Sequence, residues 1–63
     1  MNAIGKVFKD KNENHVVVVS QGKRLPEGFA YEVMMYKVRY MTRDKESWFS
    51  KMLFLNNFVE VKD

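Results

Sequence analysis

The stretch FAYEVMMYKVRYM, residues 29–41, decides the fold class that we predict for this chain. It contains neither Gly nor Pro and is rich in Tyr, Val and Met, a composition that favours a β-strand. From Met34 onward, apolar side chains alternate with Lys37 and Arg39, so a strand would separate them onto two faces. Before Met34 the alternation has the opposite phase, which requires a bulge, a bend or burial of both faces near Val33–Met35. A long bent strand of this kind is typical of small β-barrels.

Two shorter strands are predicted before this stretch, at residues 4–9 and 15–20, with a polar turn between them. The second of these, HVVVVS, has four consecutive valines and no alternation, so both of its faces should be covered. The segment QGKRLPEG (21–28) contains two glycines and the single proline, and it predicts a loop.

Two more strands are predicted after the central stretch, at residues 46–50 and 58–62. The polar residues 42–45 predict a hairpin turn. Between the last two strands, residues 51–56 predict one helical or 3₁₀ turn. An alternative stays open, because apolar residues with helical spacing and Asp44 as an N-cap fit a helix over 44–56.

These elements predict a mainly all-β fold, a small five-stranded SH3-like barrel with one short helical turn near 51–56. The alternative is an α+β fold with a C-terminal helix at 44–56. Sixty-three residues make a single domain, 1–63, near the lower size limit for a chain that folds on its own core. Because there is no Cys, packing or a partner subunit must supply the stability.

The residue types that carry enzyme chemistry are sparse. One His cannot build a His-based zinc site, the carboxylates are scattered singly, and no glycine-rich phosphate loop occurs. We therefore expect no catalytic, metal or cofactor site and a protein that is not an enzyme. The N-terminus lacks the apolar core of a signal peptide, and no run reaches membrane-spanning length. We expect a cytoplasmic protein, in a bacterial host, with no membrane partner.

Basic and aromatic side chains around the central strand are candidates for a partner-binding surface. The alternative is that the aromatic side chains belong to the core and the basic ones to a solvated strand face. The aromatic members with polar groups are expected to be partly exposed. Such a set suits stacked bases beside a phosphate backbone, and it equally suits a protein hot spot. The candidates are Tyr31, Tyr36, Lys37, Arg39, Tyr40, Arg43, Lys45 and Trp48, with Lys23 and Arg24 from the loop.

Short motifs near both ends of the chain resemble those of a known family. The first strand contains Gly5-Lys6-Val7-Phe8, and Trp48 is followed by Phe54-Leu55-Asn56-Asn57-Phe58-Val59-Glu60. In these motifs the chain resembles an uncharacterised family of small bacterial and prophage proteins with an SH3-like barrel. The family usually has Arg-Pro shortly after the Trp, where this chain has Ser50-Lys51. The resemblance implies a small-barrel fold and an association with phage.

The sequence supports three hypotheses for function. The first is a non-enzymatic phage or prophage accessory protein that acts by contact with a host protein. The second is a nucleic-acid-binding barrel that uses the basic and aromatic strand face. It ranks lower because the net charge is only +3 and Glu32, Asp44 and Glu46 lie among the bases. The third is a structural or self-associating protein, a homodimer, favoured by Met34 and Met35 pointing to opposite faces of one strand.

Overall fold

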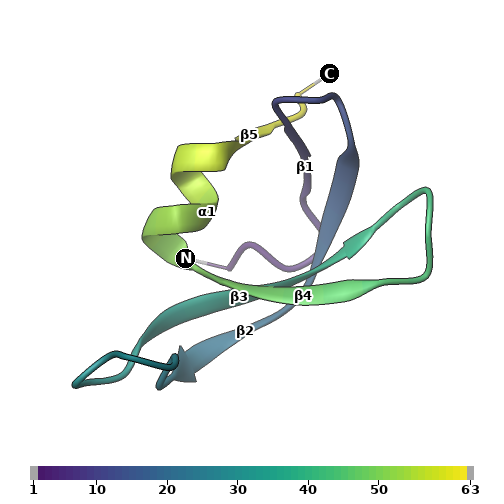
Figure 1. Ribbon diagram of the computed structural model, residues 1–63. Helices are drawn as coiled ribbons and strands as arrows, with labels where there is room; N and C mark the ends of the chain where they lie inside the picture. The colour runs from purple at the N-terminus through teal and green to yellow at the C-terminus, as the bar shows by residue number, and fades with distance from the viewer. Residues whose placement is uncertain (1, 63) are drawn as a thin grey trace.

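The central stretch forms strand β3 (Val33–Tyr40) in the computed structural model, which describes residues 2–62. Within those residues the chain forms five antiparallel strands in one sheet and one short helix (Figure 1). The mainly β fold predicted from the sequence is confirmed. The other elements are β1 (Val7–Asp10), β2 (His15–Arg24), β4 (Glu46–Ser50), α1 (Lys51–Asn57) and β5 (Phe58–Glu60).

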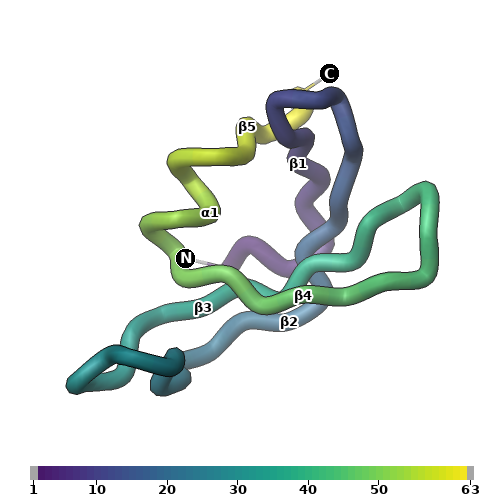
Figure 2. The backbone as a smooth tube through the Cα atoms, viewed as in Figure 1, coloured from purple at the N-terminus to yellow at the C-terminus, as the bar shows by residue number. Residues whose placement is uncertain are grey.

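The strands are ordered β4-β3-β2-β1-β5, so β4 and β5 lie at the two edges of the sheet. The predicted closure into a barrel is therefore wrong: the sheet stays open between its edges. Helix α1 connects the two edge strands and lies between them. The sheet curves toward the side on which the helix lies (Figure 1). The backbone tube shows the β2–β3 hairpin extending away from this curled part (Figure 2).

Several predicted boundaries shift. The strand predicted at 29–41 begins at Val33, so residues 29–32 belong to a loop, and the phase change in the sequence lies where the strand begins. The loop predicted at 21–28 is shorter, because Gln21–Arg24 continue β2 and pair with Val33–Tyr36. Pairing with a long partner strand outweighs the weak strand preference of Gly22.

The C-terminal elements follow the prediction more closely. The strand at 46–50 is confirmed, and the turn predicted at 51–56 is the helix α1. The alternative helix over 44–56 is wrong, because Glu46–Ser50 pair with β3 in a strand. The first and last strands are shorter than predicted: β1 begins at Val7 and β5 ends at Glu60.

The alternation predicted for β3 is confirmed. Tyr36 and Val38 are buried in the core, whereas Arg39 on the opposite face is exposed. The register between β2 and β3 shifts between Val18 and Ser20, so the bulge lies in β2 and not in β3. The valine run is covered unequally on its two faces, since alternate valines are buried and the others half-buried. The core consists of Phe8, Val16, Val18, Tyr36, Val38, Phe54 and Phe58.

Candidate functional site

The predicted basic and aromatic residues do not share one face. Tyr36 is only 7% exposed and packs edge-on against Phe54, with ring centroids 5.4 Å apart. The prediction that Tyr36 would be partly exposed is therefore wrong. Tyr40 lies on the same side of β3 and packs against the core, whereas Trp48 pairs with Lys37 on the opposite face.

The two bases on the outer face of β3 are held by one acid from β4. Glu46 accepts from Lys37 Nζ at 3.1 Å and from Arg39 Nη2 at 3.2 Å. The hydrogen bond from Lys37, and then that from Arg39, lowers the pKa of the Glu46 carboxyl below its usual value of 4.5. The ionised carboxylate offsets part of the positive charge that this face would offer to a phosphate backbone.

Two of the predicted aromatic rings are already covered by guanidinium groups. Arg24 lies over the Trp48 ring at 4.4 Å from its centroid, and Arg43 lies over Tyr40 at 4.8 Å. Stacking of this kind is favourable and occupies the ring face that a base would need. Lys23, at the end of β2, and Lys45, in the β3–β4 turn, are exposed.

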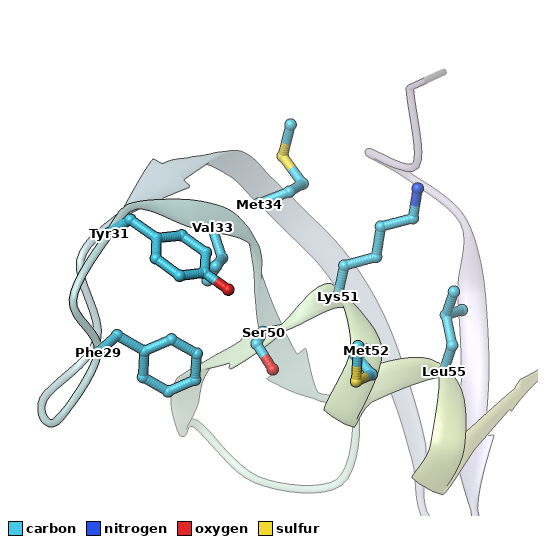
Figure 3. Close-up of a pocket in the computed structure, with 8 residues that line it drawn as sticks. All are labelled: Phe29, Tyr31, Val33, Met34, Ser50, Lys51, Met52 and Leu55. Carbon is cyan, nitrogen blue, oxygen red and sulfur yellow. The ribbon is translucent and has the colours of Figure 1, made fainter.

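A different surface is formed by α1 and the loop before β3. The helix has four consecutive apolar residues, MLFL, but buries only Phe54, while Met52 is 77% exposed and Leu55 is 52% exposed. The loop adds Tyr31, which is 71% exposed, and Phe29. These side chains line an open hollow of about 480 Å³, here called the apolar groove, with Phe29 and Tyr31 pointing from the loop toward the helix (Figure 3). The residues lining it are Phe29, Tyr31, Val33, Met34, Ser50, Lys51, Met52 and Leu55.

Comparison of the chain with models of protein families, with curated proteins and with solved structures found no match. Function is therefore inferred from the geometry of the surface. No helix in residues 2–62 is long and apolar enough to cross a membrane. Among the same residues, no three His, Asp or Glu side chains gather as metal ligands would.

Local interactions hold both walls of the apolar groove in place. Ser50 ends β4 and caps α1, its side-chain oxygen accepting from the Leu53 N–H at 3.3 Å. The strand therefore turns into the helix without a linker. On the other wall, the loop folds back on itself through the Phe29 N–H, which donates to the Pro26 carbonyl at 3.1 Å, and through Gly28, whose φ is +85°.

Further hollows continue the apolar groove on both sides of α1. One is shared by Met52 and Phe29 and reaches Trp48 on the outer face of the sheet. The other is shared by Lys51 and Leu55 and reaches the N-terminal residues near Lys6, with Glu60 at its edge. None of the ion pairs formed within residues 2–62 involves Lys51.

Of the predicted site residues, only Tyr31 lines the apolar groove. The sequence signal that identifies the groove is the MLFL run, because a helix of two turns cannot bury four successive apolar residues against one sheet. No sequence pattern indicates that Phe29 and Val33 line the groove, because their positions depend on how the loop before β3 folds.

Proposed function

We propose that this protein is a non-enzymatic binding protein that acts by contact with another protein through the apolar groove. The observation that supports this most directly is the exposure of Met52, Leu55 and Tyr31 around a single hollow. Contiguous apolar surface rimmed by polar groups typically marks an interaction site in a small domain. Methionine and tyrosine also suit such a site, since thioethers adapt to a partner and Tyr supplies a rigid amphipathic ring.

The resemblance of Gly5-Lys6-Val7-Phe8 and of the C-terminal motif to the prophage family adds a second part to the proposal. In this hypothesis the protein is a phage or prophage accessory protein, and its partner is a protein of the bacterial host. This part rests on those sequence motifs alone.

Nucleic-acid binding remains the second candidate because several bases lie on or near the outer face of the sheet. Lys37 and Arg39 emerge together there, and Arg24 reaches the same face through its contact with Trp48. We rank it below protein binding because Glu46 neutralises part of that charge. Self-association through the apolar groove is the third candidate.

The deciding experiment compares three forms of the chain as bait in a bacterial lysate. These are the wild type, Met52→Gln/Leu55→Gln, which removes apolar surface without adding charge, and the matched control Lys37→Ala/Arg39→Ala. We expect a saturable protein partner that is lost with the first variant and retained with the second. A partner retained equally by both variants would contradict the use of the apolar groove.

Nucleic-acid binding is tested separately, by titration in solution. Titration with single- and double-stranded DNA and RNA at about 50 and about 200 mM salt covers the range over which phosphate-driven affinity falls by orders of magnitude. Binding that is salt-sensitive and lost in Lys37→Ala/Arg39→Ala would raise this candidate above protein binding. We expect no such binding.

A further inference from the structure

Strand β3 extends past the end of its neighbour β4. The register between the two strands ends where Met35 lies opposite Ser50. Val33 and Met34 continue β3 beyond this point and are paired on the other side with Arg24 and Lys23 of β2. On the β4 side, the chain has turned away into α1. One edge of β3 is therefore open over its first residues.

Hydrogen bonds at the other end of β3 show which way the backbone groups point at this open edge. The Tyr40 N–H donates to the Lys45 carbonyl, on the β4 side, at 3.1 Å. The Met41 N–H donates to the His15 carbonyl, on the β2 side, at 3.0 Å. Because backbone groups alternate sides along an antiparallel strand, Met34 presents its N–H and C=O toward the β4 side, like Tyr40. Residue 51, which would lie opposite Met34, is the first residue of α1.

This open edge coincides with the apolar groove. Phe29, Tyr31 and Val33 lie on one side of the hollow and Met52 and Leu55 on the other, as Figure 3 shows. The space between them is in line with β4. It therefore offers a main-chain donor and acceptor together with apolar walls, which is the combination used when an extended peptide adds a strand to a sheet.

The charged side chain that lines the groove favours an acidic group in the occupant. Lys51 lines it, and the adjoining hollow adds Lys6 against a single acid, Glu60. A second copy of this chain docked through the same groove would place another Lys51 beside this one, and both chains carry a net charge of +3, so self-association is disfavoured. A carboxylate of a different partner would lie near Lys51, which forms no ion pair with an acid in residues 2–62.

We propose that an extended, acidic and apolar segment of the partner protein adds to the sheet at Met34, in line with β4. Its backbone pairs with Met34, its alternate apolar side chains fill the groove, and an acidic side chain lies near Lys51. This inference rests on the proposed function, because it names the kind of partner segment that the groove takes.

The first test uses a display library of random 12-residue peptides with the wild-type chain as target. We expect enriched peptides with alternating apolar residues and at least one Asp or Glu. Lys51→Glu should bind a synthetic copy of the enriched peptide roughly five-fold more weakly. Enrichment of apolar residues at helical spacing, of basic peptides, or of no sequence at all would overturn the strand proposal.

The second test measures the backbone of Met34 directly. Hydrogen exchange of the Met34 amide in the ¹⁵N-labelled wild type should slow when the enriched peptide binds, because the amide acquires an acceptor. Met34→Pro removes that donor and should abolish binding, whereas Met34→Leu should bind like the wild type. Since the proline variant can fail to fold, the exchange measurement on the wild type is decisive. Unchanged exchange with the peptide bound would overturn the proposal.

These outcomes separate the inference from the function on which it rests. Enriched peptides whose apolar residues have helical spacing, and which shift the resonances of Met52 and Leu55, would contradict strand addition but support the groove as a protein-binding site. A partner that binds Met52→Gln/Leu55→Gln as well as the wild type would contradict both strand addition and the proposed function. Sedimentation of the free chain as a dimer that dissociates in this variant would instead assign the groove to a second copy.

Discussion

Phe54 is the residue through which α1 is attached to the sheet. Its side chain is fully buried, and its ring packs edge-on against Phe8, with centroids 4.7 Å apart, and stacks on Phe58 at 4.6 Å. The same ring packs against the Tyr36 ring, with centroids 5.4 Å apart, so one residue joins the helix to β1, β3 and β5. Aromatic contacts of this geometry add to the free energy gained from burial alone.

Replacing Phe54 with Ala should remove a large part of the stability of the protein. The expected loss in the free energy of unfolding is about 3–5 kcal/mol, from lost burial and the cavity left behind. A domain of this size has roughly 3–9 kcal/mol in total. Urea denaturation followed by circular dichroism measures the loss, and Phe54→Leu, which keeps part of the volume, should remain folded. An unchanged midpoint in Phe54→Ala would contradict the central place of this ring.

Glu46 makes the stability of the sheet depend on pH. Because its pKa is lowered in the folded protein, the stabilisation is fully present above its unfolded pKa and is lost as the pH falls through the folded value. Thermal unfolding between about pH 3 and pH 7 should show a smaller decline on acidification for Glu46→Gln than for the wild type. Lys37→Ala/Arg39→Ala should flatten the profile in the same way. Identical profiles for all three forms would contradict the ion pairs.

A second carboxyl contributes acid sensitivity at the β1–β2 turn. Asp10 accepts from the backbone N–H groups of Asn12 and Asn14, each at 2.9 Å. The hydrogen bond from the Asn14 backbone is the main cause of the lowered pKa of Asp10. Glu46→Gln should therefore reduce the decline on acidification without abolishing it, because Asp10 still titrates.

At the scale of the element, α1 is too short to be stable by itself. Isolated helices of fewer than about 12 residues are marginal in water, and this helix has seven. It persists because Ser50 caps its first turn, Phe54 anchors its middle, and the Phe58 N–H donates to the Phe54 carbonyl at its end. The helix and the edge strands that it joins therefore pack as one unit.

Removing the cap should loosen this unit and the groove wall together. Ser50→Ala should lower the free energy of unfolding by about 1 kcal/mol, because the Leu53 N–H loses its acceptor. Ser50→Asp retains an acceptor and should stay close to the wild type. Amide exchange along residues 51–57 measures the effect locally. Equal stability of the Ala and Asp variants would show that the cap has no role.

At the scale of the whole molecule, the chain exposes more surface than its mass requires. Its accessible area is 4782 Å², whereas a 7.5 kDa monomer of average shape exposes about 4,200 Å². The excess agrees with the elongated dimensions of 36 × 24 × 18 Å, to which the projecting β2–β3 hairpin contributes. The apolar groove lies between that hairpin and α1, so the open shape and the exposed apolar surface arise from the same feature.

Binding and stability should therefore be separable by mutation. Met52→Gln/Leu55→Gln alters two side chains that already contact water, so the free energy of unfolding should change by no more than about 1 kcal/mol. The thermal midpoint should stay within about 8 °C of the wild type. Differential scanning calorimetry measures both. Loss of the folded state in this variant would mean that these residues belong to the core and not to a surface.

The sequence by itself determined the elements whose patterns are local. The alternation from Met34 to Tyr40 defined most of β3 and its two faces, and the order of polar and apolar residues placed β4 and the turn that became α1. These predictions succeed because side-chain periodicity acts over a few neighbouring residues.

Only the tertiary structure decided the shape of the sheet and the surface it presents. Whether β4 meets β5, whether Gly22 joins a strand, and whether Tyr36 is buried all depend on segments distant in the sequence. The apolar groove has the same origin, because Tyr31 and Met52 belong to separate elements that lie opposite each other only after β3 and β4 have paired. No local pattern encodes such contacts, since they follow from how much apolar surface the whole chain can bury at once.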